Sequence, residues 1–381
     1  MTDLRHLEDR YQLDTYAKLP LSIEKGRGCS VFDEDGTEYL DLYGGHCVAS
    51  TGHCHPKIVK AIQQQAAQLI FYSNATYNSV RGRALEKLAQ FCEPAQYQAF
   101  LANSGAEVNE NAIKLARALT GRPTVISTQN AFHGRTYGSL SATGIDKYRA
   151  YLNTPVPHHT VLPVEEVALA VNEETAAVLI EPIQSMSGVE EISSETLKAI
   201  ETACRVKGAI LIFDEIQTGV GRTGSFLLSQ QLGIAPDLTS LAKGIASGYP
   251  AAALLVSESI AHQVKKGDLG STFGGNPLAC AAILATLEIL EEEDLTSNAA
   301  VIGSYLKRKL RELSGVKEVR GRGLLLGISF QDYTAKEVQK HLVENRILAG
   351  TSNNPDILRL MPPLTLSHEN ADQFIQVLRK L

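Results

Sequence analysis

The chain has 381 residues, of which 44% are hydrophobic and 20% are charged, and its net charge at pH 7 is −6. This length predicts two domains, or one large α/β body with an appendage, and the composition excludes a disordered chain. The absence of a basic block excludes a nucleic-acid partner, and the lack of a long apolar run or signal-type start predicts a cytoplasmic protein without a membrane contact.

The first 55 residues contain short strands separated by turns, expected at 29–33 and 38–42. From residue 56 onward, helical patterns alternate with short apolar runs. This alternation predicts an α/β fold with a mostly parallel sheet and helices on both faces. The helices are expected at 57–70, 81–92, 105–119, 194–206 and 277–292, and the strands at 97–101, 124–127, 177–180, 210–213 and 252–256.

The C-terminal part has a different pattern. A long helix is expected from the acidic turn at 291–294 to about residue 314, and a turn at 321–323 then leads into a strand. Helices are expected near 335–346 and 368–380. Because the N-terminal strands have no helical cover of their own, the two chain ends are expected to combine. We therefore predict a large domain of residues 56–290 and a small α+β domain formed by residues 1–55 together with 291–381.

The six cysteines are scattered without CxxC spacing, so we expect reduced thiols rather than disulfides. The only dense group of metal-type ligands is His46-Cys47 followed by His53-Cys54-His55. Adjacent side chains of a strand or turn point apart, and no second ligand pair follows at a zinc-site spacing. We therefore expect no metal site.

The strongest chemical signal is a carboxylate at the end of a buried strand, followed 29 residues later by a lone lysine. The apolar run Ile210–Phe213 ends in Asp214, and Lys243 lies between Ala242 and Gly244. A desolvated lysine becomes a nucleophile, and a buried aspartate needs a cation or hydrogen-bond donors. This pair suits pyridoxal phosphate, with the lysine forming the Schiff base and the aspartate on the pyridine nitrogen. Taken alone, each residue also has a simpler interpretation. The aspartate suits a cap or an ion-pair partner, and the Lys-Gly pair suits a turn.

Three further motifs follow strands or precede helices. Leu101–Glu107 predicts a phosphate cradle at a helix N-terminus, or simply a capping box made by Ser104 and Glu107. Ala131–Thr136 offers an aromatic ring and an arginine to a planar, carboxylate-bearing ligand, although such residues also fill cores and face solvent. Gly270–Pro277 is a glycine-rich loop suited to oxyanion binding or to a tight turn before a helix. A second strand-end carboxylate is Glu181.

The order and approximate spacing of these motifs resemble those of the fold type I, class-III aminotransferases. The resemblance extends over essentially the whole chain, from Glu38–Asp41 to Arg359–Pro363. Within the family, the chain is most similar to the branch that acts on acetylated ornithine in arginine biosynthesis, through Asn103–Glu110, Phe132–Thr136 and Ser271–Pro277. The resemblance implies a pyridoxal-phosphate enzyme and a homodimer whose active sites are shared between subunits.

The resemblance also implies a role for each matching residue. Lys243 would hold the cofactor and move the substrate proton, and Asp214 would keep the pyridine nitrogen protonated. The other implied contacts are Gln217 to the ring hydroxyl, Phe132 and Ile216 to the two ring faces, Gly105, Ala106 and Thr272 of the partner subunit to the phosphate, and Arg135, Ser271 and Arg359 to the substrates.

Two positions depart from the family pattern. Met186 stands where much of the family has a glutamate that pairs with the arginine matching Arg359. Arg359 therefore lacks its expected partner, and the protein must discriminate between the substrates of the two half-reactions by other means. His46 stands where relatives carry isoleucine or tyrosine at the substrate entrance, where it either contacts substrate or fills space.

The resemblance implies that the δ-amino group of N2-acetyl-L-ornithine passes to 2-oxoglutarate, giving N-acetylglutamate 5-semialdehyde and glutamate. N2-succinylornithine, ornithine and 4-aminobutyrate are alternative donors with the same chemistry. A non-catalytic binding protein of this fold would be free to lose Lys243 or Asp214, and both are present. A nicotinamide-dependent dehydrogenase would need G-x-G-x-x-G after an early strand, whereas Gly321–Gly323 precedes a strand.

Overall fold

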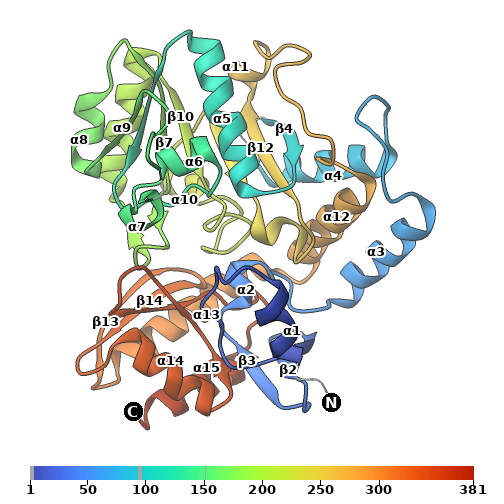
Figure 1. The fold of residues 1–381 in the computed structure, drawn as a ribbon, viewed down its shortest axis with the longest axis vertical. Coiled ribbons are helices and arrows are strands. Elements are labelled where there is room, and N and C mark those ends of the chain that lie inside the picture. Colours follow the sequence, from blue (N-terminus) through green and yellow to red (C-terminus); the bar gives the residue numbers. More distant parts are fainter. Residues whose placement is uncertain (1–3, 93–96, 151) are drawn as a thin grey trace.

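The computed structural model describes residues 4–92, 97–150 and 152–381. A seven-stranded sheet with the order β4-β12-β11-β10-β7-β5-β6 occupies the centre of the upper half in Figure 1. Six strands run in one direction, and β12 alone is antiparallel to its neighbours, which confirms the predicted mostly parallel sheet. The strands are β4 (Tyr97–Ala102), β5 (Thr124–Thr128), β6 (His159–Leu162), β7 (Thr175–Ile180), β10 (Ile210–Asp214), β11 (Leu238–Leu241) and β12 (Ala252–Ser257).

Helices cover both faces of this sheet because its central strands are apolar on both sides. Every residue of β7 and β10 is buried. Successive side chains point to opposite faces, so Ala177 and Leu179 pack with α5 (Gly105–Thr120). Val178 and Ile180 pack instead with α9 (Ser194–Lys207). Two separate apolar layers therefore hold the sheet and fix the ends of its strands.

Local capping explains where α5 begins and ends. The Ser104 hydroxyl accepts the amide of Glu107 at 3.2 Å, and Gly121 closes the helix with a left-handed φ of 67°. The Glu107 carboxylate turns back to accept the Asn103 amide at 2.9 Å. The N-terminus of α5 thus follows β4 directly and lies at the edge where the parallel strands end.

Two smaller four-stranded sheets are built from the ends of the chain. One has the order β1-β2-β3-β15 and the other β13-β14-β17-β16. Leu40 pairs with Ile347, so a strand from the N-terminal part lies beside one from the C-terminal part, as the blue and orange-red ribbons of Figure 1 show. The strands are β1 (Ile23–Arg27), β2 (Ser30–Asp33), β3 (Glu38–Asp41), β13 (Val316–Arg322), β14 (Leu325–Phe330), β15 (Ile347–Leu348), β16 (Gly350–Thr351) and β17 (Ile357–Leu360).

We propose that this pairing joins residues 1–55 and 291–381 into one unit, with 56–290 as the other. The helices of the first unit are α1 (Leu4–Tyr11), α2 (Gly44–Cys47), α13 (Leu295–Arg311), α14 (Ala335–Glu344) and α15 (His368–Leu378). The remaining elements are α3 (Pro56–Gln68), α4 (Ser79–Phe91), α6 (Tyr137–Ala142), α7 (Asp146–Arg149), α8 (Val164–Ala170), α10 (Leu228–Leu232), α11 (Glu258–Ala261), α12 (Pro277–Glu292), the 3-10 helix η1 (Lys243–Ala246) and the short strands β8 (Ile183–Gln184) and β9 (Glu190–Glu191).

The elements expected from the sequence are present with boundaries shifted by a few residues, with one local correction. Gly321 and Arg322 lie within β13, and the turn of the β13–β14 hairpin falls on Gly323 and Leu324. The expected turn at 321–323 is therefore displaced, because Gly321 pairs with Leu326 in the ladder. None of the helices in the described ranges has the length and apolar character needed to cross a membrane.

The packing of α13 on this hairpin generates a stability prediction. A Cβ at Gly303 would lie 2.0 Å from the carbonyl oxygen of Gly323, a backbone atom that cannot rotate away. We expect Gly303→Ala to lower the free energy of unfolding by about 3 kcal/mol. The control is Gly82→Ala on α4, where a Cβ meets nothing within 4 Å and helix propensity favours alanine by roughly 0.5–1 kcal/mol. Thermal denaturation that shifted both variants equally would contradict this account.

Candidate active site

A cavity of about 460 Å³ lies at the edge where the parallel strands of the central sheet end. The carboxyl edge of an open α/β sheet is the usual position of a ligand site in such folds, because loops from several strands converge there. The lining comes from the segments after β4, β5, β7, β10 and β11 and from the segment before β12. It comprises Val48, Asn103, Ser104, Gly105, Ala106, Phe132, His133, Gly134, Arg135, Glu181, Asp214, Ile216, Gln217, Ala242, Lys243, Gly248, Tyr249, Pro250 and Ala251.

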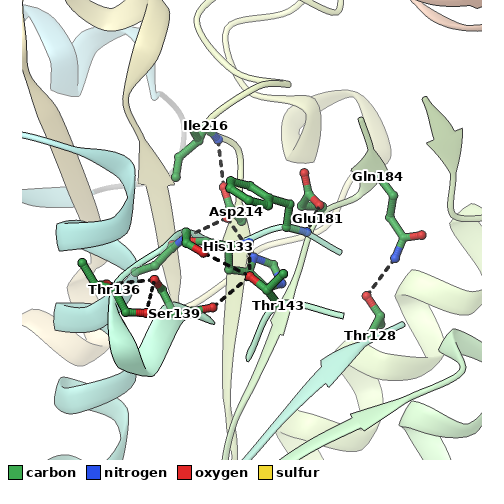
Figure 2. Close-up of polar contacts among 12 residues, drawn as sticks. Thr128, His133, Thr136, Ser139, Thr143, Glu181, Gln184, Asp214 and Ile216 are labelled. Carbon is green, nitrogen blue, oxygen red and sulfur yellow. Dashed lines mark hydrogen bonds and ion pairs between the residues drawn. The ribbon is translucent and has the colours of Figure 1, made fainter. Parts of the chain in front are cut away.

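The carboxylate of Asp214 is the most heavily hydrogen-bonded group of this cavity. Its Oδ2 accepts the Asn109 side-chain amide at 2.8 Å and lies 2.9 Å from Nδ1 of His133. Its Oδ1 accepts the Ile216 amide at 3.1 Å, and Figure 2 shows His133 and Ile216 approaching it from different segments. Donors from three separate segments fix the orientation of this carboxylate. The arrangement places a negative charge at the floor of the cavity.

A chain of hydroxyl groups supports His133 from behind. The His133 amide donates to the Thr143 hydroxyl at 3.0 Å, which in turn donates to the Ser139 carbonyl at 3.0 Å. The Ser139 hydroxyl lies 2.9 Å from that of Thr136, and this ladder is visible at the lower left of Figure 2. The Asn109 side chain also donates to the His133 carbonyl at 2.8 Å. The loop that carries His133 is therefore held at several points.

Lys243 enters the cavity from the first residue of η1, directly after β11. Its backbone has a positive φ of 45°, a strained conformation for a lysine that is held by the surrounding structure. Ser50 donates to the carbonyl of the next residue, Gly244, at 2.6 Å. Burial lowers the pKa of the Lys243 amine below its usual value, and the nearby negative charge of Asp214 partly opposes this effect.

The N-terminus of α5, where the sequence predicts a phosphate cradle, lies at the cavity. Gly105 and Ala106 line the cavity, and amides of a first helical turn have no acceptor within the helix. A Cβ at Gly105 would lie 2.6 Å from Cδ1 of Ile216, so only glycine lets the helix approach this side chain so closely. Ser104 caps the helix, as the capping interpretation predicted, whereas the phosphate cradle stays a prediction. Helix N-termini of this kind bind phosphate groups.

The donor set fits pyridoxal phosphate. A carboxylate with fixed donors suits a protonated ring nitrogen, and the free helix N-terminus suits a phosphate. Phe132 and Ile216 both line the cavity as apolar walls, and Gln217 adds an amide. Lys243 supplies the amine that such a cofactor requires. Of the twelve residues predicted for the site, the structure thus brings eight around one cavity: Gly105, Ala106, Phe132, Arg135, Asp214, Ile216, Gln217 and Lys243.

The other four predicted residues lie outside this lining. The Ser271 hydroxyl accepts from the Asn103 side chain at 3.1 Å and donates to Glu107, so it lies behind the cradle. Thr272 is exposed on the same loop. The ring of His46 is hydrogen-bonded to the Tyr43 hydroxyl, and partial burial together with nearby Arg359 lowers the pKa of His46 to about 4. His46 is therefore neutral at physiological pH.

Arg359 is a buried residue of β17. Its Nε donates to the Thr351 carbonyl at 2.8 Å, and its Nη1 donates to the carbonyl and hydroxyl oxygens of Ser185 at 3.4 and 3.1 Å. Burial lowers the pKa of Arg359 from its very high ordinary value. The Arg135 guanidinium carbon lies 4.0 Å from the centre of the Tyr148 ring, a stacking contact that orients the arginine.

Several residues with a role in the geometry were not among the predicted site residues. Asn109 stands on the buried face of α5 between apolar neighbours, and an amide in that position is the signal that could have identified it. His133 and Ser185 are the direct neighbours of Phe132 and Gln184, which belong to two motifs that the sequence had already indicated. Glu181 was recognised as a strand-end carboxylate but not placed in the site.

Four of the five metal-type ligands near the N-terminus, His46, Cys47, His53 and His55, have partners within the protein, and Cys54 is exposed. His53 Nε2 lies 2.7 Å from the Asp41 carboxylate, and His55 Nε2 lies 3.0 Å from that of Glu293. The Cys47 thiol approaches the Gln217 carbonyl at 3.7 Å. In the described ranges, no three histidine, cysteine, aspartate or glutamate side chains gather as metal ligands would.

Glu181 is the second carboxylate of the cavity, and its surroundings are less polar than those of Asp214. Its Oε2 accepts the Phe132 amide at 2.7 Å, and Figure 2 shows it beside Asp214. Burial raises the pKa of Glu181 far above its ordinary value, and the negative charge of Asp214 raises it further. The folded protein therefore holds a proton on Glu181 that the unfolded chain releases above about pH 4.5.

This proton makes stability depend on pH with a defined sign. Because the folded-state pKa is raised, the stability of cofactor-free wild type relative to the Glu181→Gln variant should fall as pH rises from about 5 to about 8. The expected loss is on the order of 2 kcal/mol, measured by denaturation at each pH. Glu166→Gln, an exposed position on α8, should show no such trend. A pH-independent difference for Glu181→Gln would contradict the assignment.

Comparison with known proteins agrees with this geometry. The class-III aminotransferase profile matches residues 11–381. The chain is 39% identical to the acetylornithine aminotransferase of Methanothermobacter thermautotrophicus, over 99% of this chain and 97% of that protein. It is 40% identical to the acetylornithine aminotransferase of Aquifex aeolicus, over 97% of this chain and 99% of that protein.

A solved structure shares the fold over nearly the same length. The ornithine aminotransferase of Toxoplasma gondii, whose active site holds pyridoxal phosphate at partial occupancy, aligns with a TM-score of 0.93 and 32% identity. The alignment covers 99% of this chain and 92% of that one. The chain therefore belongs to the class-III aminotransferases and is a pyridoxal-phosphate-dependent aminotransferase.

Proposed function

We propose that this aminotransferase transfers the δ-amino group of N2-acetyl-L-ornithine to 2-oxoglutarate, in the arginine biosynthetic route. The observation that carries the proposal is the cavity in which Lys243 and Asp214 lie together with Arg135, a guanidinium suited to a substrate carboxylate. The names of the relatives at 39–40% identity support acetylornithine as the donor. Ornithine remains the second candidate, because the ornithine aminotransferase shares the fold at 32% identity.

The chemistry divides between the cofactor and the protein. Pyridoxal phosphate supplies an electron sink for the negative charge left when the carbon beside the amino group loses a proton. The free amine of Lys243 takes that proton and returns it, because burial has lowered its pKa toward the range of a general base. Asp214 would place a negative charge by the ring nitrogen of the bound cofactor and thereby keep it protonated. The α5 amides at Gly105 and Ala106 would hold its phosphate.

Two arginines divide the recognition of carboxylates. Arg135 lies at the cavity wall, where it binds the carboxylate of the acylated donor and the far carboxylate of 2-oxoglutarate. Arg359 lies deeper, behind Ser185, and binds the carboxylate next to the reacting carbon of glutamate. His46 is a neutral group beside Tyr43 and Arg359, and we propose that it contacts the substrate at the entrance.

We propose that the working enzyme is a homodimer with shared active sites. The loop that carries Ser271 and Thr272 is exposed next to an apolar pair, Phe71 and Phe273, whose ring centres lie 5.3 Å apart. Phe273 is 60% exposed, an unusual position for a large apolar ring unless another chain covers it. A second copy placed here would bring Thr272 of the partner subunit to the phosphate and Ser271 of the partner subunit to the acyl group.

The donor can be identified from the first half-reaction. Holoenzyme mixed with N2-acetylornithine should convert the cofactor absorbance to that of the amine form at least about tenfold faster than with ornithine or 4-aminobutyrate. Free ornithine would place its α-ammonium group beside the Arg135 guanidinium, and 4-aminobutyrate carries its carboxylate one carbon closer to the reacting carbon. N2-succinylornithine is measured beside it and tests the size of the acyl pocket. If the free amines react as fast as the acylated donors, the proposed substrate is wrong.

The covalent role of Lys243 is tested by its removal. Lys243→Ala should retain no cofactor after borohydride reduction and denaturation, as read by mass spectrometry, because the attaching amine is absent. Its turnover should fall by roughly 10³-fold, since the same amine is the proposed base. Lys266→Ala, an exposed position, is the matched control and should keep the attachment and the rate. A reduced cofactor adduct in Lys243→Ala would refute the assignment.

A further inference from the structure

Arg359 is a buried cation whose contacts are all neutral. Its Nε and Nη1 donate to oxygens of Thr351 and Ser185, and among the described residues it forms no ion pair. Its Nη2 makes no hydrogen bond to any residue of the described ranges. A buried charge without a counter-ion is costly, so it is retained where a ligand supplies the opposite charge. Ser185 is thus the only side chain that holds this guanidinium within the described part of the chain.

The hydroxyl of Ser185 connects Arg359 to a residue of the cofactor cavity. It accepts Nη1–H of Arg359 at 3.1 Å and donates to Oε1 of Gln217 at 3.0 Å. The direction of this chain follows from its two ends, because a guanidinium only donates and an amide oxygen only accepts. Ser185 is completely buried, so no water competes for these contacts. Hydrogen bonds in such a chain polarise one another.

The consequence for Gln217 is a fixed orientation of its amide. With Oε1 engaged by Ser185, the Nε2 end is the one left for a ligand in the cavity that Gln217 lines. A nitrogen donor in this position suits an oxygen that carries negative charge. Ser185 therefore determines which end of the amide faces the cofactor.

We infer that Ser185 is a positioning residue that links carboxylate binding at Arg359 to the hydrogen bond that Gln217 offers to the cofactor. The inference rests on the proposed function for the role of Arg359. Because a hydroxyl is neutral, it holds the guanidinium in place without cancelling its charge. Arg359 thus stays open to a carboxylate in both half-reactions, and Met186 next to Ser185 offers no acid to cover it.

The backbone around Ser185 is held independently of its hydroxyl. The Met186 carbonyl accepts the Asn353 amide at 2.7 Å, and the Ser185 carbonyl accepts the Gly188 amide at 3.2 Å. Ser185→Ala therefore removes the link and leaves these anchors in place. Ser187→Ala, two residues along the same segment, removes a hydroxyl that touches neither Arg359 nor Gln217 and is the matched control.

The experiment compares two unreactive anions on the holoenzyme, titrated through the cofactor absorbance. Glutarate has two carboxylates and is expected to use both arginines, whereas butyrate has one carboxylate and is expected to use Arg135. Ser185→Ala should raise the Kd of glutarate about tenfold and that of butyrate less than about twofold, because a hydrogen bond to a charged group is lost at Arg359 alone. It should also speed release of the cofactor, followed by fluorescence, and Ser187→Ala should change none of these quantities.

A double-mutant cycle separates positioning from general damage. In an Arg359→Met background, Ser185→Ala should weaken glutarate no further, whereas equal weakening with and without Arg359 would overturn the inference. Equal losses of glutarate and butyrate, unchanged cofactor release, or the same effects in Ser187→Ala would also overturn it. An acylated ornithine that fails to react would refute the proposed donor, and the glutarate measurements would still decide the role of Ser185.

Discussion

The constraint on which the site depends is the satisfaction of one buried carboxylate, that of Asp214. An ionised group at the end of a buried strand is strongly destabilising unless donors reach it, and here they come from α5, from the loop after β5 and from the turn after β10. These donors fix the rotation of α5 and the course of the loop that carries Phe132. The same contacts therefore place the helix N-terminus and the aromatic wall around the aspartate.

Much of this arrangement could be predicted because it depends on local patterns. Apolar runs that end in a carboxylate identified β7 and β10 with their terminal residues, and parallel strands bring such residues to one edge. The donors to Asp214 could not be found in this way, since Asn109 and His133 are 105 and 81 residues distant in sequence. The strand β11 was also missed, because its threonine and serine side chains are buried within the sheet and interrupt the apolar run.

The charges of the cavity explain why it suits anionic ligands. Lys243 and Arg135 line it, Arg359 lies behind it, and only Asp214 is held as an anion by three donors. Glu181 receives a single hydrogen bond, and burial next to Asp214 raises its pKa, so it does not add a second full negative charge at neutral pH. The two carboxylates thus differ in the number of hydrogen bonds that they accept. Because Glu181 adds no full negative charge, the positive charges of Lys243, Arg135 and Arg359 stay available for phosphate and carboxylate groups.

The segment after β7 shows how a substitution can change the charge balance of a site without changing the fold. The resemblance to the class-III family implies a carboxylate at position 186 that would neutralise Arg359 when no substrate carboxylate is present, whereas Met186 cannot do so. The guanidinium instead donates hydrogen bonds to Ser185 and Thr351, whose uncharged oxygens orient it without neutralising its charge. Because those oxygens carry no charge, a substrate carboxylate has no competing anion to displace when it binds Arg359. Under the proposed function, recognition of the donor carboxylate therefore falls to Arg135, while Ser185 orients the amide of Gln217 at the cavity.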